Sequence, residues 1–471
     1  MKRVLFFILS LVTLVAILLS GCTPTPAETP VSAPPTTAPA AEQPTAAPVE
    51  EQPVFDWKKY AGTEITYSYD EHAYSEAIQN HLAEFEELTG IKVKAELLPD
   101  SAYWDKLNIV LSSKSGEWDV VGTGIEPMWD QAKPGYLEPL EKYLNDPTLT
   151  SPDYDFQDIL PFLREASMWD LNDCSKIGSG STWIIPHSFE NMNLMYRKDI
   201  FEKHQLAVPT TVPELLEVAK QLKTLEPDMI PFTARGTRFW SAIHPGYISM
   251  AASYGVKDFD ENCKPVMNSP QSAEFMGLYA DLIRNYGPKN WSSNNWYEVV
   301  DDLANSRAVM AVDANMFGFW NDVEGASKAA GNIAFAPPPK APGAANFNTN
   351  IWIWALALNS ASKNKEAAWY FIQWATGKDL VLKGALDGKM INPIRQSVWD
   401  DPKWKAYATQ PTFNNYYDTF YSTIPFTSLL FTPRAGFGAA INEWAATLQD
   451  VVTGNKDPQE ELDALVKRIS Q

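Results

Sequence analysis

Strand-like and helix-like hydrophobic periods alternate along most of this 471-residue chain, and this alternation limits the folds open to it. In EITYSY, Ile65, Tyr67 and Tyr69 repeat every two residues, as in a half-buried strand. After it, Ile78 and Phe85 lie on one helical face. The alternation continues through IKVKAELL, residues 103–113, WDVVGTG, PELLEVAKQLKTL, SAEFMGLYADLIRNYG and KNKEAAWYFIQWATG. It predicts an α/β fold, and the absence of a fixed repeat excludes solenoids and propellers.

The first 22 residues, MKRVLFFILSLVTLVAILLSGC, have the pattern of a secretory signal that ends in a lipobox. Lys2 and Arg3 precede an apolar run, and small residues come just before Cys22. We therefore expect a cleaved signal peptide over residues 1–21 and a lipid on the Cys22 thiol. An uncleaved membrane-spanning anchor is the alternative, although the run is marginal in length for it. The pattern predicts a lipid-anchored protein outside a bacterial cell membrane.

Residues 22–55 have a different composition from the rest of the chain. Pro, Thr and Ala recur there, and between Cys22 and Phe55 there is no aromatic residue and no Lys or Arg. Such a segment cannot build a hydrophobic core, and its prolines favour an extended backbone. We expect a solvated, semi-rigid linker, with the folded part starting near Phe55 to Trp57.

Size and charge narrow the remaining possibilities. About 415 residues follow the predicted linker, which is large for one compact core, so two lobes are expected. The formal net charge of −20 repels phosphate backbones and anionic lipids. We therefore expect no nucleic-acid partner, and contact with the membrane through the lipid anchor alone. We also expect a monomer.

Cys174 and Cys263 are the only cysteines besides Cys22. In an exported protein, two such residues can form a disulfide. Two free buried thiols are the alternative, and the sequence leaves both open.

Aromatic residues are numerous, with 17 Trp, 19 Tyr and 22 Phe. Several Trp lie in polar or turn-rich stretches, namely TRFW, NWSSNNW and NIWIW. An indole face matches the C–H face of a sugar or polyol, while carboxylates and amides bind the hydroxyls. This composition favours a carbohydrate ligand.

Signals for catalysis are weaker. The sequence has no Walker-type loop, no G-x-G-x-x-G after a strand, no G-x-S-x-G and no H-E-x-x-H. The five histidines show no metal-ligand spacing. We expect no enzyme activity, no cofactor and no metal. A secreted carbohydrate hydrolase stays the alternative, because the many carboxylates could supply a catalytic pair.

The most specific pattern is GSTWIIPHSFENMNLMYRKDIFEKHQLAVPTTVPELLEVAKQL, residues 180–222. Trp183–Pro186 and Tyr196–Phe201 match a Tyr-Gly-Ile-Pro strand and a Tyr-Asn-Lys-Asp-Leu-Phe segment, and Val212-Pro213 replaces the usual Trp-Asp. This region resembles the family 1 extracellular solute-binding proteins of bacterial ABC importers. Collinear matches cover residues 60–465: TGIKVKAELLP, WDVVGTG, SRAVMAVDAN and ALALNSASKNKEAAWYFIQWATG.

Within that family, the chain looks most similar to the polyol, or sorbitol/mannitol-type, branch. The segments that carry this likeness are RGTRFW, NSRAVMAVDA, NIAFAPPPK, NIWIWALALNSASKNKEAAWYFIQWAT and INPIRQSVWDD. The resemblance implies a type II periplasmic-binding-protein-like fold, with a ligand cleft between two α/β lobes joined by hinge strands. It implies a first lobe from 56–186 and 336–398, a second lobe from 187–335, and a C-terminal helical part, 399–471, mostly on the second lobe.

The resemblance also implies candidate ligand-binding residues. Several follow strands at the edge where such sheets bind ligands, or lie in the acidic loop of the family pattern. For each carboxylate or arginine, a helix cap, a turn or a solvated surface position is the alternative reading. These candidates are Asp70, Glu71, Thr123, Glu126, Glu190, Arg235, Asp313 and Arg434.

Three tryptophans complete the predicted site. Trp352 and Trp354 alternate in one strand and so share a face, which could instead belong to the core. Trp240 is another stacking platform. The sequence therefore predicts the extracytoplasmic substrate-binding lipoprotein of an ABC importer, which delivers a sugar, sugar alcohol or short oligosaccharide to the membrane permease. A secreted hydrolase, or the same fold with a non-carbohydrate ligand, is the alternative.

Overall fold

A nine-stranded β-sheet organises the part of the chain that the computed structural model describes, residues 54–471. The predicted signal peptide (1–21), Cys22 and all but the end of the predicted linker (22–55) lie outside these residues. The strand order is β2-β1-β3-β10-β6-β8-β7, with β11 beside β10 and β9 beside β6, and β4 and β5 form a separate pair. The strands are β1 Glu64–Asp70, β2 Lys92–Leu98, β3 Val120–Gly124, β4 Met168–Trp169, β5 Ser181–Thr182, β6 Ile185–Arg197, β7 Ile230–Thr233, β8 Ala308–Ala314, β9 Ile333–Ala336, β10 Thr349–Leu358 and β11 Thr427–Ser428.

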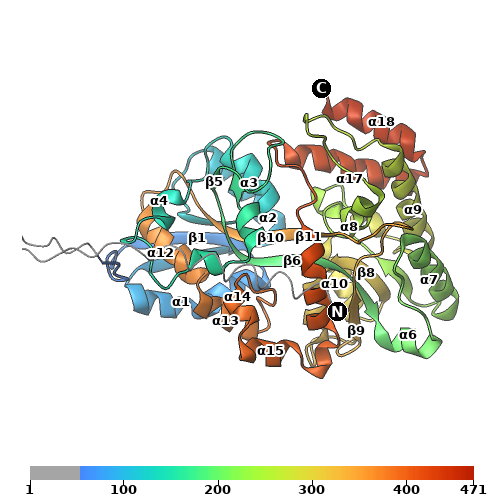
Figure 1. Cartoon of the computed structure of the whole chain (residues 1–471), viewed down its shortest axis with the longest axis horizontal. Coiled ribbons are helices and arrows are strands. Elements are labelled where there is room, and N and C mark those ends of the chain that lie inside the picture. The colour runs from blue at the N-terminus through green and yellow to red at the C-terminus, as the bar shows by residue number, and fades with distance from the viewer. Residues whose placement is uncertain (1–53) are drawn as a thin grey trace, which may run out of the picture. The chain divides into compact units, whose positions relative to one another are not determined.

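The two longest strands, β6 and β10, join the two ends of the sheet (Figure 1). The first part of β6, up to Asn191, pairs with β10, and its second part, from Met192, pairs with β8 and β9. The end of β10, from Trp354, pairs antiparallel with β3. We call the part around β1, β2 and β3 the first half and the part around β7, β8 and β9 the second half. β6 and β10 pair with each other between the two halves and so connect them.

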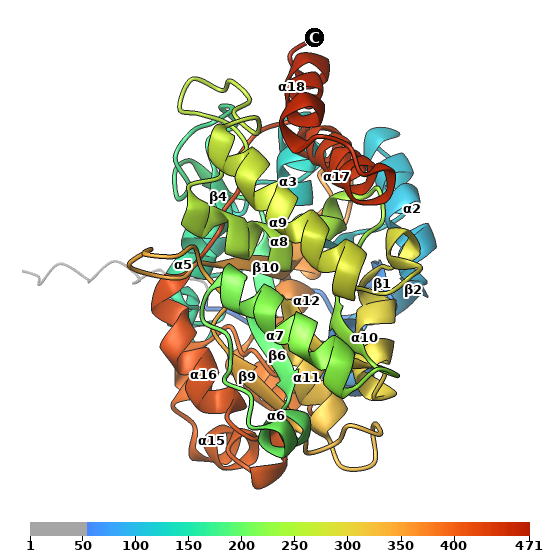
Figure 2. The ribbon, with the colours of Figure 1, turned by 90° about the vertical axis from the view of Figure 1, so that its right-hand side faces the viewer.

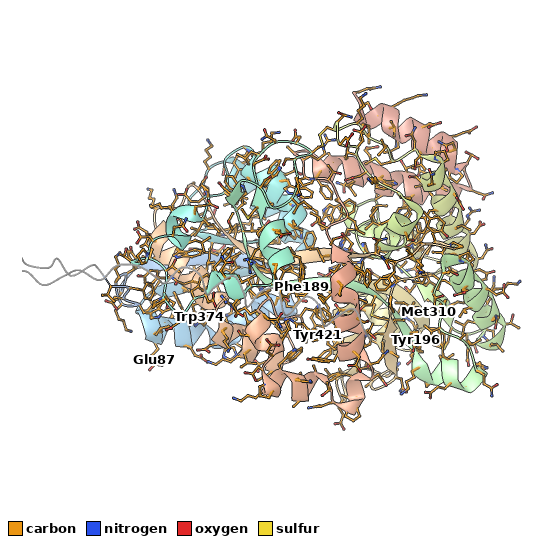
Figure 3. The ribbon with its side chains drawn as sticks, viewed as in Figure 1. Glu87, Phe189, Tyr196, Met310, Trp374 and Tyr421 are labelled. Carbon is orange, nitrogen blue, oxygen red and sulfur yellow. A yellow bond between two sulfur atoms is a disulfide. The ribbon has the colours of Figure 1, made fainter. Side chains whose placement is uncertain are left out.

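The side chains labelled in Figure 3 show the same division. In Figure 3, Glu87 and Trp374 lie in the first half, while Tyr196 and Met310, which are register partners on β6 and β8, lie in the second. Phe189, on β6, lies between them. β6, β8 and β10 are buried along almost their whole length, as expected for central strands that are covered on both faces.

Helices cover the sheet in both halves. In Figure 2, α7 and α9 lie across the outer side of the second half, where they contact β7 and each other. The helices are α1 Ala73–Thr89, α2 Asp100–Ser112, α3 Ile125–Ala132, α4 Glu141–Leu144, α5 Pro161–Ala166, α6 Lys198–His204, α7 Val212–Leu225, α8 Gly246–Ala251, α9 Pro270–Tyr286, α10 Trp296–Ala304, α11 Asn315–Asp322, α12 Lys365–Ala375, α13 Lys378–Leu386, α14 Gln396–Trp399, α15 Pro402–Ala408, α16 Tyr416–Thr423, α17 Phe437–Gly454 and α18 Pro458–Ile469.

Local sequence signals explain where several helices begin and end. A capping box of Thr211 and Glu214 starts α7. Another, of His72 and Ser75, starts α1, and α1 stops at Gly90, whose φ of 74° is in the left-handed region that glycine adopts without strain. The cap on α1 places His72 just after β1, at the carboxyl edge of the sheet.

Cys174 and Cys263 form a disulfide, one of the two alternatives that the sequence leaves open. Cys174 lies in the loop between β4 and β5, and Cys263 lies in the loop that leads into α9. The two cysteines are 89 residues apart in the chain, so the bond closes a long loop. A cross-link of this length restricts the unfolded chain strongly.

We expect that replacing both cysteines, with Cys174→Ala and Cys263→Ala together, lowers the free energy of unfolding by about 2–4 kcal/mol. Urea unfolding of the chain without its predicted signal peptide measures this. Reductant should bring the wild-type midpoint down towards that of the double variant and leave the double variant unchanged. Equal midpoints for the two proteins without reductant would contradict the stabilising role.

Candidate functional site

A cavity rich in aromatic side chains lies where the two halves meet. His72, Asp100 and Trp104 reach it from the first half, and Glu190 reaches it from β6. The cavity is small, with a volume of about 40 Å³. Its remaining walls come from the second half and from β10: Arg235, Phe239, Trp240, Ser241, His244, Asn295, Trp296, Phe317, Trp352 and Trp354.

Tryptophan rings form the flat walls of this cavity. Trp352 and Trp354 alternate on β10 and so share one face, with ring centroids 5.5 Å apart. Trp240 stacks on Trp352, with centroids 4.7 Å apart and an angle of 23° between the rings. The ring of His72 lies 4.7 Å from that of Trp354. The rings offer broad apolar faces for contact with C–H groups.

Glu190 supplies a carboxyl group to the cavity. It is 3% exposed and lies opposite Trp352 in the register of β6 and β10. Trp354 Nε1 donates a hydrogen bond of 2.7 Å to Glu190 Oε1. Burial raises the pKa of Glu190 to about 7, although the charge of Arg235 and the Trp354 hydrogen bond oppose this rise. The group therefore titrates near neutral pH.

Arg235 is the cation of the cavity, and Asp313 holds it. The two residues follow β7 and end β8, which are parallel neighbours with Thr233 opposite Ala311, so their side chains meet at one edge. Arg235 Nε donates to Asp313 Oδ2 at 2.9 Å, and Nη2 donates to Oδ1 at 2.5 Å. Asp313 does not line the cavity. Its place is behind Arg235, where it fixes the guanidinium in a forked ion pair.

Asp70 and Glu126 are buried carboxylates beside this site. Asp70 ends β1 and Glu126 lies in the first turn of α3, so both are at the same edge of the first half. Neither lines the cavity, and none of their carboxylate oxygens has a hydrogen-bond partner within the described residues. Burial raises the pKa of both well above the usual range, and the nearby charge of Glu190 adds to the rise. Burial therefore favours the protonated form of both.

The structure brings together on the cavity five of the residues expected from the sequence: Glu190, Arg235, Trp240, Trp352 and Trp354. Three others lie apart from it. Glu71 is exposed, and Thr123 is buried and donates to Gln131 Oε1 at 2.8 Å. The Arg434 guanidinium lies over the ring of Phe259, 4.1 Å from its centroid.

Several cavity residues were not expected from the sequence. Trp296 belongs to NWSSNNW, a stretch that the aromatic pattern singles out, and His72 follows closely after β1. Phe239 belongs to TRFW and Asn295 to NWSSNNW, which the same pattern singles out. The other residues have no sequence signal, because they become neighbours only when the halves meet. Burial lowers the pKa of His72 to about 3 and that of His244 well below its usual value, so both imidazoles are neutral. The full set of unexpected residues is His72, Asp100, Trp104, Phe239, Ser241, His244, Asn295, Trp296 and Phe317.

Two further findings concern the described residues only. Among residues 54–471, no group of three or more His, Cys, Asp or Glu side chains is arranged to hold a metal ion. No helix in that range combines the length and the apolar character needed to cross a membrane.

The raised pKa of Glu190 predicts a pH dependence of stability. A folded-state pKa of about 7, against 4.5 for the free group, means that the folded protein binds this proton more tightly than the unfolded chain. The stabilisation is complete below about pH 4.5 and is lost as the pH rises through 7, and it amounts to about 3 kcal/mol. In Glu190→Gln this contribution is absent at every pH.

Urea unfolding of ligand-free protein at about pH 5 and about pH 8 measures this effect. Wild type should lose about 2.5 kcal/mol more than Glu190→Gln between the two pH values, because a small part of the stabilisation is already lost at the lower one. Glu87→Gln changes an exposed glutamate and should follow wild type. Parallel pH profiles for wild type and Glu190→Gln would rule out a titrating, buried Glu190.

Comparison with known protein families gives a match over most of the chain. The family described as "Bacterial extracellular solute-binding protein" matches residues 69–381. An erythritol/L-threitol-binding protein of Mycolicibacterium smegmatis is 33% identical over 417 residues, which are 88% of this chain and 86% of that protein. A mannitol-binding protein of Pseudomonas aeruginosa is 25% identical over 292 residues, 61% of this chain and 63% of that protein.

Solved structures of related proteins have the same fold. An ABC transporter solute-binding protein of Agrobacterium vitis with bound D-mannitol has a TM-score of 0.73 and 25% identity, over 87% of this chain and 97% of that one. A maltose-bound protein of T. maritima has a TM-score of 0.75 and 21% identity, over 87% and 99% of the two chains. The expectation of two α/β lobes is confirmed by these matches.

Proposed function

The chain belongs to the bacterial extracellular solute-binding protein family, and we propose that its ligand is a short, open-chain polyol. As a member of this family it is the extracytoplasmic substrate-binding component of an ABC importer, with the permease subunits as its partners. The cavity between the halves, which correspond to the two lobes of the family fold, is the proposed ligand site.

The observation that carries the proposal is a small cavity in which tryptophan faces surround two carboxyl groups, those of Asp100 and Glu190, and the guanidinium of Arg235. Trp240, Trp352 and Trp354 can cover the C–H groups of a carbon chain, while Glu190 and Arg235 can bind its hydroxyls. Because the cavity volume is only about 40 Å³, the cavity favours a narrow ligand over an oligosaccharide.

The hydrogen-bonding groups of the cavity suit hydroxyls because a hydroxyl both donates and accepts. Glu190 uses only Oε1 on Trp354, which leaves Oε2 for a ligand. The buried Nε1 of Trp352 has no partner within residues 54–471 and can donate. The charge of Arg235 is already balanced by Asp313, so the site does not call for an anionic ligand.

The relatives support the same class of ligand. The names of two of them, an erythritol/L-threitol-binding protein and a mannitol-binding protein, specify open-chain polyols. The related structure from Agrobacterium vitis holds D-mannitol. We further propose that the chain binds its ligand without turning it over, as a monomer, and that a lipid on Cys22 anchors it to the cell membrane.

We expect calorimetry to detect erythritol, L-threitol, ribitol or mannitol binding to wild-type protein, with no product formed. Trp354→Phe removes the indole N–H that bonds Glu190, and should weaken binding by about 1–3 kcal/mol. Trp57→Phe alters a half-buried tryptophan that packs on Tyr370 away from the cavity, and should bind as wild type does. Turnover above a protein-free control, or no binding across the panel, would refute the proposal.

The lipid anchor has a separate test. Cys22→Ser removes the only thiol at the lipobox, so the protein should appear in the soluble extracytoplasmic fraction and take up no labelled fatty acid. Cys174→Ala serves as the control, since that cysteine lies in the folded part and should leave labelling unchanged. Label retained on Cys22→Ser would overturn the assignment.

A further inference from the structure

A second cavity lies directly beside the ligand cavity, and three aromatic side chains line both. These side chains are Trp104, Phe239 and Trp240, which we call the aromatic wall. The second cavity is here called the outer groove. Its volume is about 340 Å³, whereas that of the ligand cavity is about 40 Å³. The larger of the two cavities therefore lies on the side of the aromatic wall that faces away from the ligand cavity.

The wall is built from both halves of the molecule. Trp104 comes from α2 in the first half, where its Nε1 donates to Asp100 Oδ1 at 2.9 Å. Phe239 and Trp240 come from the second half, and the backbone N–H of Trp240 donates to Asn442 Oδ1 of α17 at 2.7 Å. Since stacking on Trp352 fixes the Trp240 ring as well, the wall is held in place on several sides.

The outer groove offers polar groups as well as aromatic ones. Asp105 and Asn108 of α2 and Asn442 of α17 line it from opposite halves. Phe239, at 37% exposed, gives it an apolar face. Side chains of this kind, facing each other across a groove, suit a hydroxylated chain or ring.

We propose that the aromatic wall sets the length of the ligand, and that the outer groove is a second subsite which the wall keeps separate from the first. This inference rests on the proposed polyol function. A short polyol fits within the ligand cavity, whereas a polyol that carries a sugar ring needs the space that Trp240 occupies. The chemical class that the joined cavities would accept is a glycosyl polyol, and Trp240 is the specificity-determining residue.

The experiment compares two probes, erythritol and maltitol, by calorimetry. Wild type should bind erythritol and show weak or no binding of maltitol. Trp240→Ala joins the two cavities and removes a stacking face, so it should bind erythritol more weakly and maltitol about tenfold or more tightly than wild type does. Trp104→Ala opens the wall from the other half and should shift preference in the same direction.

Trp296→Ala is the matched control. Trp296 is also a half-buried tryptophan of the ligand cavity, but it does not line the outer groove. This variant should lose erythritol affinity without gaining maltitol affinity. Thermal melting of each variant checks that it is folded, and the two wall variants give two independent routes to the same result.

A third variant tests the groove itself. Adding Asp105→Ala and Asn108→Ala to Trp240→Ala should remove most of the gain in maltitol affinity, because those side chains line the groove. A gain that survives both changes would show that the sugar ring lies elsewhere and would overturn the subsite.

The outcomes separate this inference from the proposed function. If wild type binds short polyols but neither wall variant gains maltitol affinity, the wall does not set ligand length and the polyol function stands. If wild type binds maltitol at least as tightly as erythritol, the wall is no barrier and the inference is wrong. If wild type binds no polyol of either kind, the proposed function has failed.

Discussion

The register between β6 and β10 is the constraint on which the rest of the structure depends. β10 pairs with β3 of the first half, β6 pairs with β8 and β9 of the second half, and the two strands pair with each other. Glu190 lies opposite Trp352 in this register, and Trp354 follows on the same face. A slip of one residue would turn all three side chains to the other side of the sheet. One set of backbone hydrogen bonds therefore both joins the halves and assembles the floor of the cavity.

Burial of ionisable groups gives the site its electrostatic character. Removing charges from water is costly unless they are paired or neutralised, and the site shows both solutions. Arg235 is paired with Asp313, while burial moves Glu190 to a pKa of about 7 and keeps His72 neutral. The result is a polar site of low net charge, which matches an uncharged polyhydroxylated ligand better than an ionic one.

Contacts between the halves matter as much as the residues inside them. Asp130 of α3 accepts a hydrogen bond from the backbone N–H of Gly438 at 3.3 Å and one from Gly436, at the start of α17. These contacts hold the first half against the helix that carries Asn442, which lines the outer groove. Since the aromatic wall has members from each half, it exists only while the halves are together. The proposed selection of ligand length therefore depends on this interface.

The sequence by itself determines the α/β class and the side chains at strand ends, such as Asp70 and Asp313, and its motifs carry the polyol-type family likeness. It can do so because hydrophobic periods and strand ends are local features. Only the tertiary structure decides that Asp313 lies behind Arg235, that Arg434 packs on Phe259, and that Trp104 and Trp240 line the same two cavities. Those relations join residues far apart in the chain, and no local pattern encodes the distance between two halves that meet only on folding.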